Sequence, residues 1–123
     1  MAQGARINLA EKLAAFTDHW APRLVETVDG YDVKLVKVKG DFVWHKHDAE
    51  DELFLVLNGC LRMDFRDRQV EVGTGEMIVV PKGVEHKPYA AEECDVLLLE
   101  RSGVVNTGDA APGALTQARL ERI

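Results

Sequence analysis

Short stretches of strand-forming residues recur along most of this chain, and turn residues end each of them. The stretches are rich in Val, Leu, Phe and Tyr, and Gly, Pro, Asn or Asp stands between them. Many short strands at regular spacing are typical of an all-β barrel or sandwich. The expected strands are residues 23–28, 31–38, 42–46, 52–57, 60–65, 69–72, 77–80, 86–90 and 95–100.

Two of the turns carry dipeptides that favour tight hairpins. Asp29-Gly30 stands between the first two expected strands, and Asn58-Gly59 stands between residues 52–57 and 60–65. Both dipeptides tolerate the positive φ angles of a two-residue type I′ turn. We therefore expect two β-hairpins, the second with the strands 52–57 and 60–65 paired to each other.

The two ends of the chain differ from its middle. Asn8 and Glu11 have the spacing of a capping box and are followed by an apolar stripe at helical spacing, so a short helix is expected near the N-terminus. From residue 102 the chain is rich in Gly, Pro and Ala. We divide the chain into an N-terminal helical arm (1–22), a β-barrel (23–101) and a C-terminal tail (102–123) that packs on the barrel or frays from it.

Composition excludes several classes of partner. The chain has 123 residues, enough for one domain with its own core, and a formal net charge of −6 without a basic cluster. Nucleic acids and anionic membranes attract clustered Lys and Arg, so neither is expected as a partner. The N-terminus lacks the apolar core of a signal peptide, and the two cysteines have no paired motif. We expect a cytoplasmic protein with two reduced thiols.

Three of the four histidines fall in a pattern that suits a metal ion. His45 and His47 stand two residues apart, so on an extended segment both imidazoles leave the same face. Glu52 begins the next expected strand, and His86 follows the turn Pro81-Lys82-Gly83. In a barrel these positions can converge on one point. The remaining histidine, His19, is assigned to the connection between helix and barrel.

The spacing of these residues resembles the two sequence motifs of the cupin superfamily. Residues 40–59 match the first motif: a glycine, His45-x-His47, Glu52, six residues and a glycine. Residues 75–86 match the second: a glycine, five residues, Pro-x-Gly, two residues and His86. The first gap is one residue shorter than usual, and Ala90 stands where the family commonly has Asn. The resemblance is to small single-domain cupins of the cupin 2 conserved-barrel type, often labelled mannose-6-phosphate isomerase-like.

This resemblance implies an all-β fold, a single double-stranded β-helix or jelly-roll barrel, preceded here by the short helix. It also implies one divalent transition metal ion on His45, His47, Glu52 and His86. Such a nitrogen and oxygen ligand set suits Zn, Mn, Fe, Ni, Co or Cu. Glu50, in the same acidic run as Glu52, is the alternative carboxylate, but its distance to Gly59 does not fit the motif.

Pairing across Asn58-Gly59 assigns faces to the two strands. The inner face would be apolar apart from Glu52, whose burial needs a partner such as a metal ion, unless it lies solvated at the barrel mouth. The outer face would carry Leu53, Leu55 and Leu57, with Trp44 beside them. An apolar outer face needs a cover. We expect either the N-terminal helix or a second copy of the chain to cover this face. A second copy would make the protein a homodimer, which is the assembly we expect.

Two functions remain open on these residues. The first is a metal-dependent enzyme acting on an unknown small molecule, of dioxygenase or isomerase/epimerase type. The second is a non-catalytic module that binds a metal or a small ligand, because cupins host many chemistries on one fold. No catalytic residue is assigned. Tyr31, Lys46, Glu85 and Tyr89 lie near the motifs, but Lys46 and Glu85 alternate with ligands and are expected to face away from the site.

Overall fold

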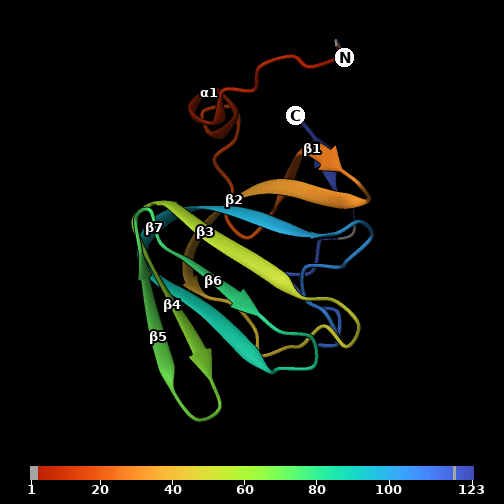
Figure 1. Cartoon of the computed structure of the whole chain (residues 1–123). Coiled ribbons are helices and arrows are strands. Elements are labelled where there is room, and N and C mark those ends of the chain that lie inside the picture. Colours follow the sequence, from red (N-terminus) through yellow and green to blue (C-terminus); the bar gives the residue numbers. More distant parts are fainter. Residues whose placement is uncertain (1–2, 118) are drawn as a thin grey trace.

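The computed structural model describes residues 3–117 and 119–123, and nearly all of its regular structure is β-sheet (Figure 1). One short helix, α1 (Leu9–Leu13), precedes the strands. The strands are β1 (Arg23–Val28), β2 (Tyr31–Asp41), β3 (Glu52–Asn58), β4 (Cys60–Phe65), β5 (Gln69–Gly73), β6 (Met77–Val80), β7 (His86–Arg101) and β8 (Glu121–Arg122). The all-β prediction with a short N-terminal helix is thus confirmed. No helix in these described ranges is long and apolar enough to cross a membrane.

The barrel is organised around β7, which pairs with three other strands. The second half of β7 pairs with β3 through Val56↔Val96 and its neighbours, and the first half pairs with β4 through Met63↔Pro88. β2 runs antiparallel along nearly the whole of β7. Because one strand serves both sheets, the two sheets close around a shared core. We predicted two strands here, 86–90 and 95–100, but they form one strand whose inward and outward alternation breaks at the exposed residues 91–93.

The two hairpin predictions had different outcomes. β1 and β2 form the expected hairpin, and Asp29 and Gly30 have φ angles of 51° and 81°, as a type I′ turn requires. The second hairpin prediction is wrong, because β3 and β4 each pair with β7 rather than with each other. Asn58-Gly59 is instead the corner at which the chain passes from one sheet to the other. A dipeptide that permits positive φ fits either geometry, so local sequence does not distinguish them.

Residues 42–46 also differ from the prediction. We expected a strand there, but β2 ends at Asp41 and the following segment leaves the sheet. It stays attached to β7 at two points: the backbone N–H of Phe42 donates to the carbonyl of Pro88, and His45 forms an isolated bridge with His86. The segment is extended without a continuous ladder, which places the His45 side chain at the end of the barrel.

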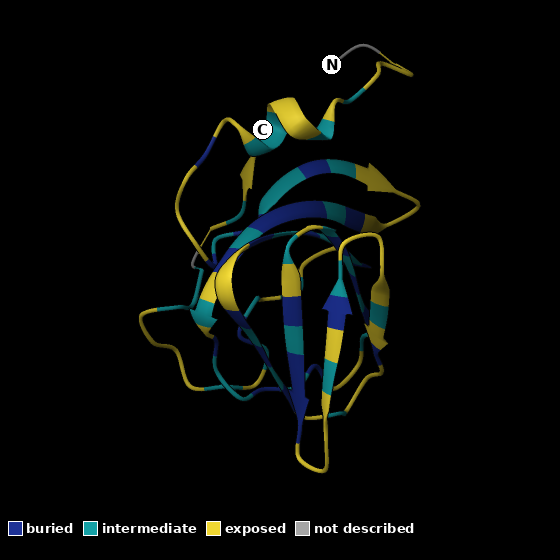
Figure 2. Ribbon diagram, turned by 90° about the vertical axis from the view of Figure 1, so that its left-hand side faces the viewer, coloured by how far each residue is buried: buried dark blue, intermediate teal, exposed yellow. Residues whose placement is uncertain are grey.

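Two apolar clusters stabilise the fold. The larger fills the barrel and contains Val36, Phe54, Met63 and Val96 among its buried members. The inward face predicted for β3 and β4 is therefore correct, since Leu61 and Phe65 are buried there as well. Figure 2 shows the buried centre of β2 between this interior and the mostly exposed helix.

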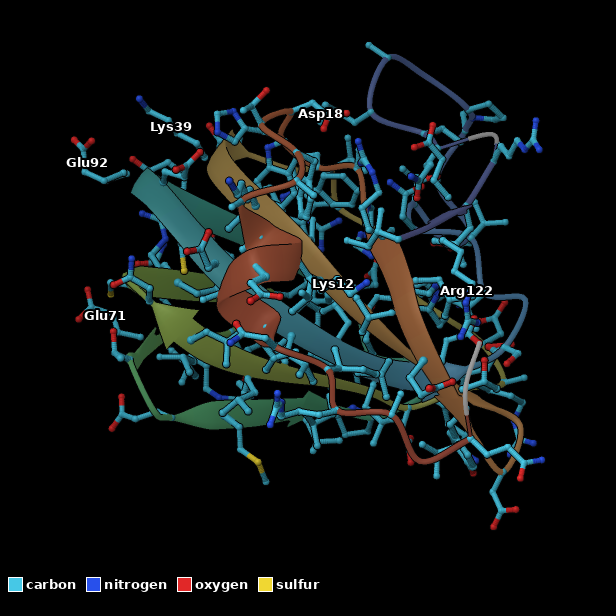
Figure 3. All side chains as sticks on the ribbon, turned by 90° about the horizontal axis from the view of Figure 1, so that it is seen from above. Lys12, Asp18, Lys39, Glu71, Glu92 and Arg122 are labelled. Carbon is cyan, nitrogen blue, oxygen red and sulfur yellow. The ribbon has the colours of Figure 1, made fainter. Side chains whose placement is uncertain are left out.

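The smaller cluster lies on the outer face of the sheet under α1. Phe16, Val25 and Leu35 are buried there, and Leu9, Leu13 and Leu57 pack against them. The side chain of Asn8 caps the helix by accepting a hydrogen bond from the N–H of Glu11. Seen from above, α1 lies over the sheet, while the charged side chains of Lys39, Glu71 and Glu92 project outward from its edge (Figure 3). The N-terminal arm thus covers part of the outer apolar face.

The corner at Gly59 can be tested by adding one methyl group. Gly59 has a φ of 106°, and a Cβ there would lie 3.1 Å from Cα of Cys94, on β7. Gly75 also has a positive φ, 81°, but a Cβ there would meet nothing within 4 Å. We expect Gly59→Ala to lower the free energy of unfolding in urea by about 2 kcal/mol and Gly75→Ala by about 1 kcal/mol, since only the first adds a clash to the left-handed backbone. Equal losses would contradict the close approach of this corner to β7.

Candidate metal centre

Three segments meet at one end of the barrel and bring the predicted ligands together. The loop before β3 carries His45 and His47, β3 begins at Glu52, and β7 begins at His86. The backbones of His45 and His86 exchange two hydrogen bonds, of 3.0 and 2.9 Å, and the N–H of Gly83 donates to the carbonyl of His47 at 2.8 Å. Figure 1 shows the loops after β2 and β6 at this same end. Backbone pairing therefore fixes the positions from which the four side chains extend.

The four side chains point toward a common centre. His45, His47, Glu52 and His86 each offer one ligand atom, and these atoms all lie within 4.8 Å of one another. Oε1 of Glu52 lies 3.4 Å from Nε2 of His47 and 3.6 Å from Nε2 of His86. All four residues are buried. Glu50, the alternative carboxylate, is not part of this group within the described residues.

Hydrogen bonds at Nδ1 set the orientation of two of the imidazoles. Nδ1 of His45 lies 2.8 Å from the carbonyl oxygen of Val43, and Nδ1 of His86 lies 2.9 Å from that of Val84. A carbonyl only accepts, so in each case Nδ1 carries the hydrogen and Nε2 keeps its lone pair. The same local arrangement, a carbonyl two residues before the histidine, thus prepares both Nε2 atoms to bind a cation.

The protonation states of the site also suit a cation. Burial and, to a smaller extent, the neighbouring His86 together lower the pKa of His45 to about 4. Burial alone would raise the pKa of Glu52, but its contacts with His47 and His86 outweigh that effect and hold the pKa well below its ordinary value. A neutral imidazole and an ionised carboxylate are the forms that bind metals.

Several buried atoms at the centre have no hydrogen-bond partner. They are Nε2 of His47, Nε2 of His86 and Oε1 of Glu52. Leaving a buried polar atom unsatisfied costs about 1–3 kcal/mol, so such atoms are rare without a reason. The unpartnered atoms are the same ones that converge, and a coordinated divalent ion would satisfy them together. The side chains present therefore fit a metal ion.

A row of buried carboxyl groups continues inward from Glu52. Across β3, β7 and β2 the register places Glu52 beside Glu100, and Glu100 beside Asp32. Oε1 of Glu100 accepts a hydrogen bond of 2.8 Å from Nζ of Lys34, and Oδ1 of Asp32 accepts one of 2.6 Å from the hydroxyl of Ser102. Like charges on neighbouring strands repel each other. One lysine among three carboxyl groups leaves an excess of negative charge that a divalent ion would balance.

The sequence analysis did not identify Lys34 and Glu100 as buried residues next to the candidate ligands. Burial and, to a smaller extent, the charge of Glu52 together raise the pKa of Glu100 to about 9. A signal was present in the strand alternation: Glu100 has the same parity as Val96 and Leu98, and Lys34 the same parity as Val36. Charged residues at inward positions of a strand predict a buried polar group.

A small cavity adjoins the candidate ligands. Its volume is about 40 Å³, and its walls are largely apolar. Polar groups reach it from His45, Glu52, Glu100 and Asn106, and its apolar walls include Trp20, Val36, Phe42, Phe54 and Leu98. The proposed acids and bases near the motifs do not line it. Lys46 pairs with Asp48 and Glu85 with Arg66, while Tyr89 lies under Arg62 and Tyr31 is exposed.

His19 lies outside the centre, as its assignment to the connection requires. Its Nε2 lies 2.8 Å from Oε1 of Glu93, and its side chain is partly exposed. His19 therefore serves as a control residue for experiments on the other three histidines.

Comparison with known proteins identifies the family. The model of the Cupin_2 family, described as a cupin domain, matches residues 32–100. The chain therefore belongs to the cupin family. It is similar to a cupin-2 domain containing protein from Shewanella frigidimarina, with 48% identity, a TM-score of 0.77, and coverage of 77% of this chain and 93% of that chain.

Two further relatives have no stated activity. Protein NMB1881 from Neisseria meningitidis is 36% identical, with a TM-score of 0.74 and coverage of 80% of this chain and 100% of that one. The uncharacterized protein YdbB of Bacillus subtilis is 36% identical over 64 residues, which is 51% of this chain and 57% of YdbB. The chain thus matches little more than half the length of this curated relative.

The depressed pKa of His45 predicts how the stability of the metal-free protein depends on pH. The ordinary value is 6.5 and the folded value about 4, so between these values the unfolded chain binds a proton that the folded chain does not. This contribution is present above pH 6.5 and is lost as the pH falls toward 4. Between pH 7 and pH 5 the free energy of unfolding, measured by urea titration in EDTA, should fall by about 2 kcal/mol less in His45→Gln than in wild type. An unchanged dependence in the variant would contradict the burial of a neutral imidazole.

Proposed function

We propose that the protein is a metal-dependent enzyme that acts on a small molecule, with one divalent transition metal ion held by His45, His47, Glu52 and His86. The observation that carries this proposal is the set of buried, unpartnered ligand atoms beside a cavity. Three imidazoles and one carboxylate suit Zn, Mn, Fe, Ni, Co or Cu. When bound, such an ion supplies Lewis-acid chemistry or, if it is iron or copper, chemistry with O₂. A dioxygenase and an isomerase or epimerase are both reactions of this kind.

The chain's own residues have separate tasks in this proposal. The carbonyl groups of Val43 and Val84 orient two imidazoles through Nδ1. The apolar walls exclude water and favour a substrate with an apolar body. Glu100 lines the same cavity, and Lys34 fixes its Oε1 while Oε2 has no hydrogen-bond partner. Because its pKa is raised to about 9, Glu100 can hold a proton at Oε2 near neutral pH.

The alternative is a non-catalytic module that binds a metal or a small ligand. The observation in its favour is the volume of the cavity, about 40 Å³, which holds only a few water molecules. The two functions are separated by loading the protein with each metal and measuring O₂ uptake and NMR-detected conversion of a metabolite panel. Conversion that depends on the metal supports the enzyme. Ligand binding without conversion, whichever metal is loaded, supports the module.

The metal site itself is tested by removing single imidazoles. His45→Ala and His86→Ala should each abolish stoichiometric metal binding, because each variant removes one of the four ligand atoms. Metal content is measured by elemental analysis of the purified, folded variants. His19→Ala should keep the wild-type content, since His19 pairs with Glu93 away from the centre. Full metal retention in both site variants would refute the proposal.

We also propose a homodimer formed through the outer face of β3 and β6. Leu53 and Leu55 are only half-buried, and their partners in register, Val79 and Met77, are 45% and 61% exposed. The helix α1 packs on Leu57, at the other end of β3. A contiguous apolar surface of this kind favours contact with a second copy of the chain.

Leu55→Glu should shift the protein from dimer to monomer in sedimentation velocity, because it places a charge at the centre of this surface. Val105→Glu is the control, since Val105 is 50% exposed but lies after β7 and outside the surface. A wild-type protein that sediments as a monomer at high concentration would remove the dimer proposal.

Both Cys60 and Cys94 are free thiols, which favours a reducing compartment and supports our assignment to the cytoplasm.

A further inference from the structure

The segment after β7 passes over the end of the barrel that contains the metal centre. We call residues 103–117 the strap. In Figure 1 this blue segment lies at the same end as the loops after β2 and β6. Asp109 joins the strap to the ligand loop twice: its N–H donates to the carbonyl of Lys46 at 3.1 Å, and its carboxylate accepts from the N–H of Lys46 at 2.8 Å. Lys46 stands between His45 and His47, so the strap is attached directly beside two of the candidate ligands.

Gly108 is the point at which the strap comes closest to the site. It has a φ of 54°, and a Cβ there would lie 3.0 Å from Cδ2 of His45 and would overlap the carbonyl oxygen of Lys46. Only glycine permits both this backbone conformation and this distance. The strap backbone therefore lies against the His45 imidazole, and a side chain at position 108 would displace it.

The strap is also attached to the segment before β1, at Pro22 and at Trp20. Nε2 of Gln117 donates to the carbonyl of Pro22 at 2.9 Å. The side-chain amide of Asn106 donates to the carbonyl of Trp20 at 3.3 Å and to that of Leu115 at 2.9 Å. Trp20 has a φ of 60°, which is strained for a non-glycine residue. Its backbone N–H and its indole N–H hold it in place by donating to the carbonyls of Lys37 and Lys39. Strain that is held by several hydrogen bonds indicates a position with a role beyond packing.

Trp20 and Asn106 together form one side of the cavity. The indole of Trp20 stacks on Phe42 with ring centroids 4.7 Å apart, and Phe42 meets the His45 ring edge-on at 5.4 Å. Both Trp20 and Asn106 line the cavity, yet both lie outside residues 32–100, the part that the cupin family model matches. This wall therefore comes from the segments before and after the part that the family model matches.

The cavity is small, so a larger ligand fits wholly inside it only if one wall moves. A volume of about 40 Å³ admits a few water molecules, whereas an aromatic ring needs a cavity of roughly 150 Å³. The barrel walls are strands in continuous ladders, and opening them would break many backbone hydrogen bonds. The strap is instead held by side-chain hydrogen bonds, by the backbone bond at Asp109 and by packing of Leu115. It has no continuous ladder to the barrel, and its hydrogen bonds to the rest of the chain are at Lys46, Trp20 and Pro22.

We propose that the strap is the movable wall of the metal cavity: ligands larger than a few atoms reach the ion when residues 103–117 lift from His45 and Trp20. The strap thereby sets which ligands reach the centre. This inference rests on the proposed function for its consequence, since a wall over the site matters only if a ligand must enter. The access that the strap controls is nevertheless a property of the metal-free chain and can be measured without the ion.

The first experiment compares two glycines of the strap in the metal-free protein. Gly108→Ala adds a methyl group against His45 and Lys46, whereas Gly103→Ala, at a φ of 92°, adds one with nothing within 4 Å. Both substitutions carry the backbone penalty of a positive φ, so only the clash differs. We expect diethyl pyrocarbonate to modify His45 about tenfold faster in Gly108→Ala than in wild type, as a tenfold larger open population predicts, and within about twofold in Gly103→Ala. Peptide mass spectrometry assigns the modified histidine.

Asn106→Ala provides a second variant that adds no clash. It removes the hydrogen bond to Trp20 and should also speed the modification of His45 several-fold. If Gly108→Ala and Asn106→Ala both react at the wild-type rate while remaining folded by circular dichroism, the strap does not control access, and the proposal is overturned.

The second experiment measures selectivity with Co²⁺ bound. Azide and 4-phenylimidazole are titrated against the visible spectrum of the Co²⁺ form. We expect Gly108→Ala to lower the Kd of 4-phenylimidazole about tenfold and to leave that of azide within about twofold, because only the larger probe needs the wall to move. Equal changes for both probes would overturn the selectivity. A wild-type chain that binds no Co²⁺ would refute the proposed function, and the modification rates would still decide the role of the strap.

Discussion

The pair of backbone hydrogen bonds between His45 and His86 is the constraint on which the site depends. These bonds form an isolated bridge between a loop that has left the sheet and the first residue of β7. The loop is also attached to β7 at Phe42 and to the turn before β7 at His47, but this bridge is the attachment that sets His45 directly beside His86. Nδ1 of each of these two residues donates a hydrogen bond to a neighbouring carbonyl. The bridge therefore fixes the backbone, and the carbonyl groups fix the orientation of the rings. Position and orientation are thus set by main-chain atoms, which most substitutions leave in place.

Electrostatics explains why this arrangement suits a cation. The inner face of β3, β7 and β2 carries three carboxyl groups in adjacent register, and the buried ammonium of Lys34 pairs with one of them, Glu100. Such a row is costly in an apolar interior unless positive charge is supplied. The chain responds in two ways: the pKa of Glu100 is raised and that of Glu52 is lowered, so the negative charge concentrates at the end where the imidazoles converge. The ionised Glu52 and the protonated Glu100 are therefore neighbours in this row.

The barrel and its extensions contribute different parts of the site. The barrel supplies all four candidate ligands and most of the apolar lining, which is the part the chain shares with other cupins. The arm and the strap supply the wall at Trp20 and Asn106, and individual backbone and side-chain hydrogen bonds hold them in place of a continuous ladder. Because the candidate ligands and the wall belong to different segments, substitutions in the wall can change which small molecules enter the cavity without changing the ligand set.

The sequence alone determined the all-β class, the N-terminal helix, the β1–β2 hairpin and the four residues that converge, because turn chemistry, two-residue alternation and motif spacing are local properties. Tertiary structure decided what these local patterns leave open. Asn58-Gly59 permits a hairpin or a corner, and the pairing of β3 and β4 with β7 selected the corner. Lys34 and Glu100 had the parity of buried residues, but only the register of three strands placed them beside Glu52. The strap has no periodicity at all, and its place over His45 follows from contacts between residues distant in sequence, which no local pattern encodes.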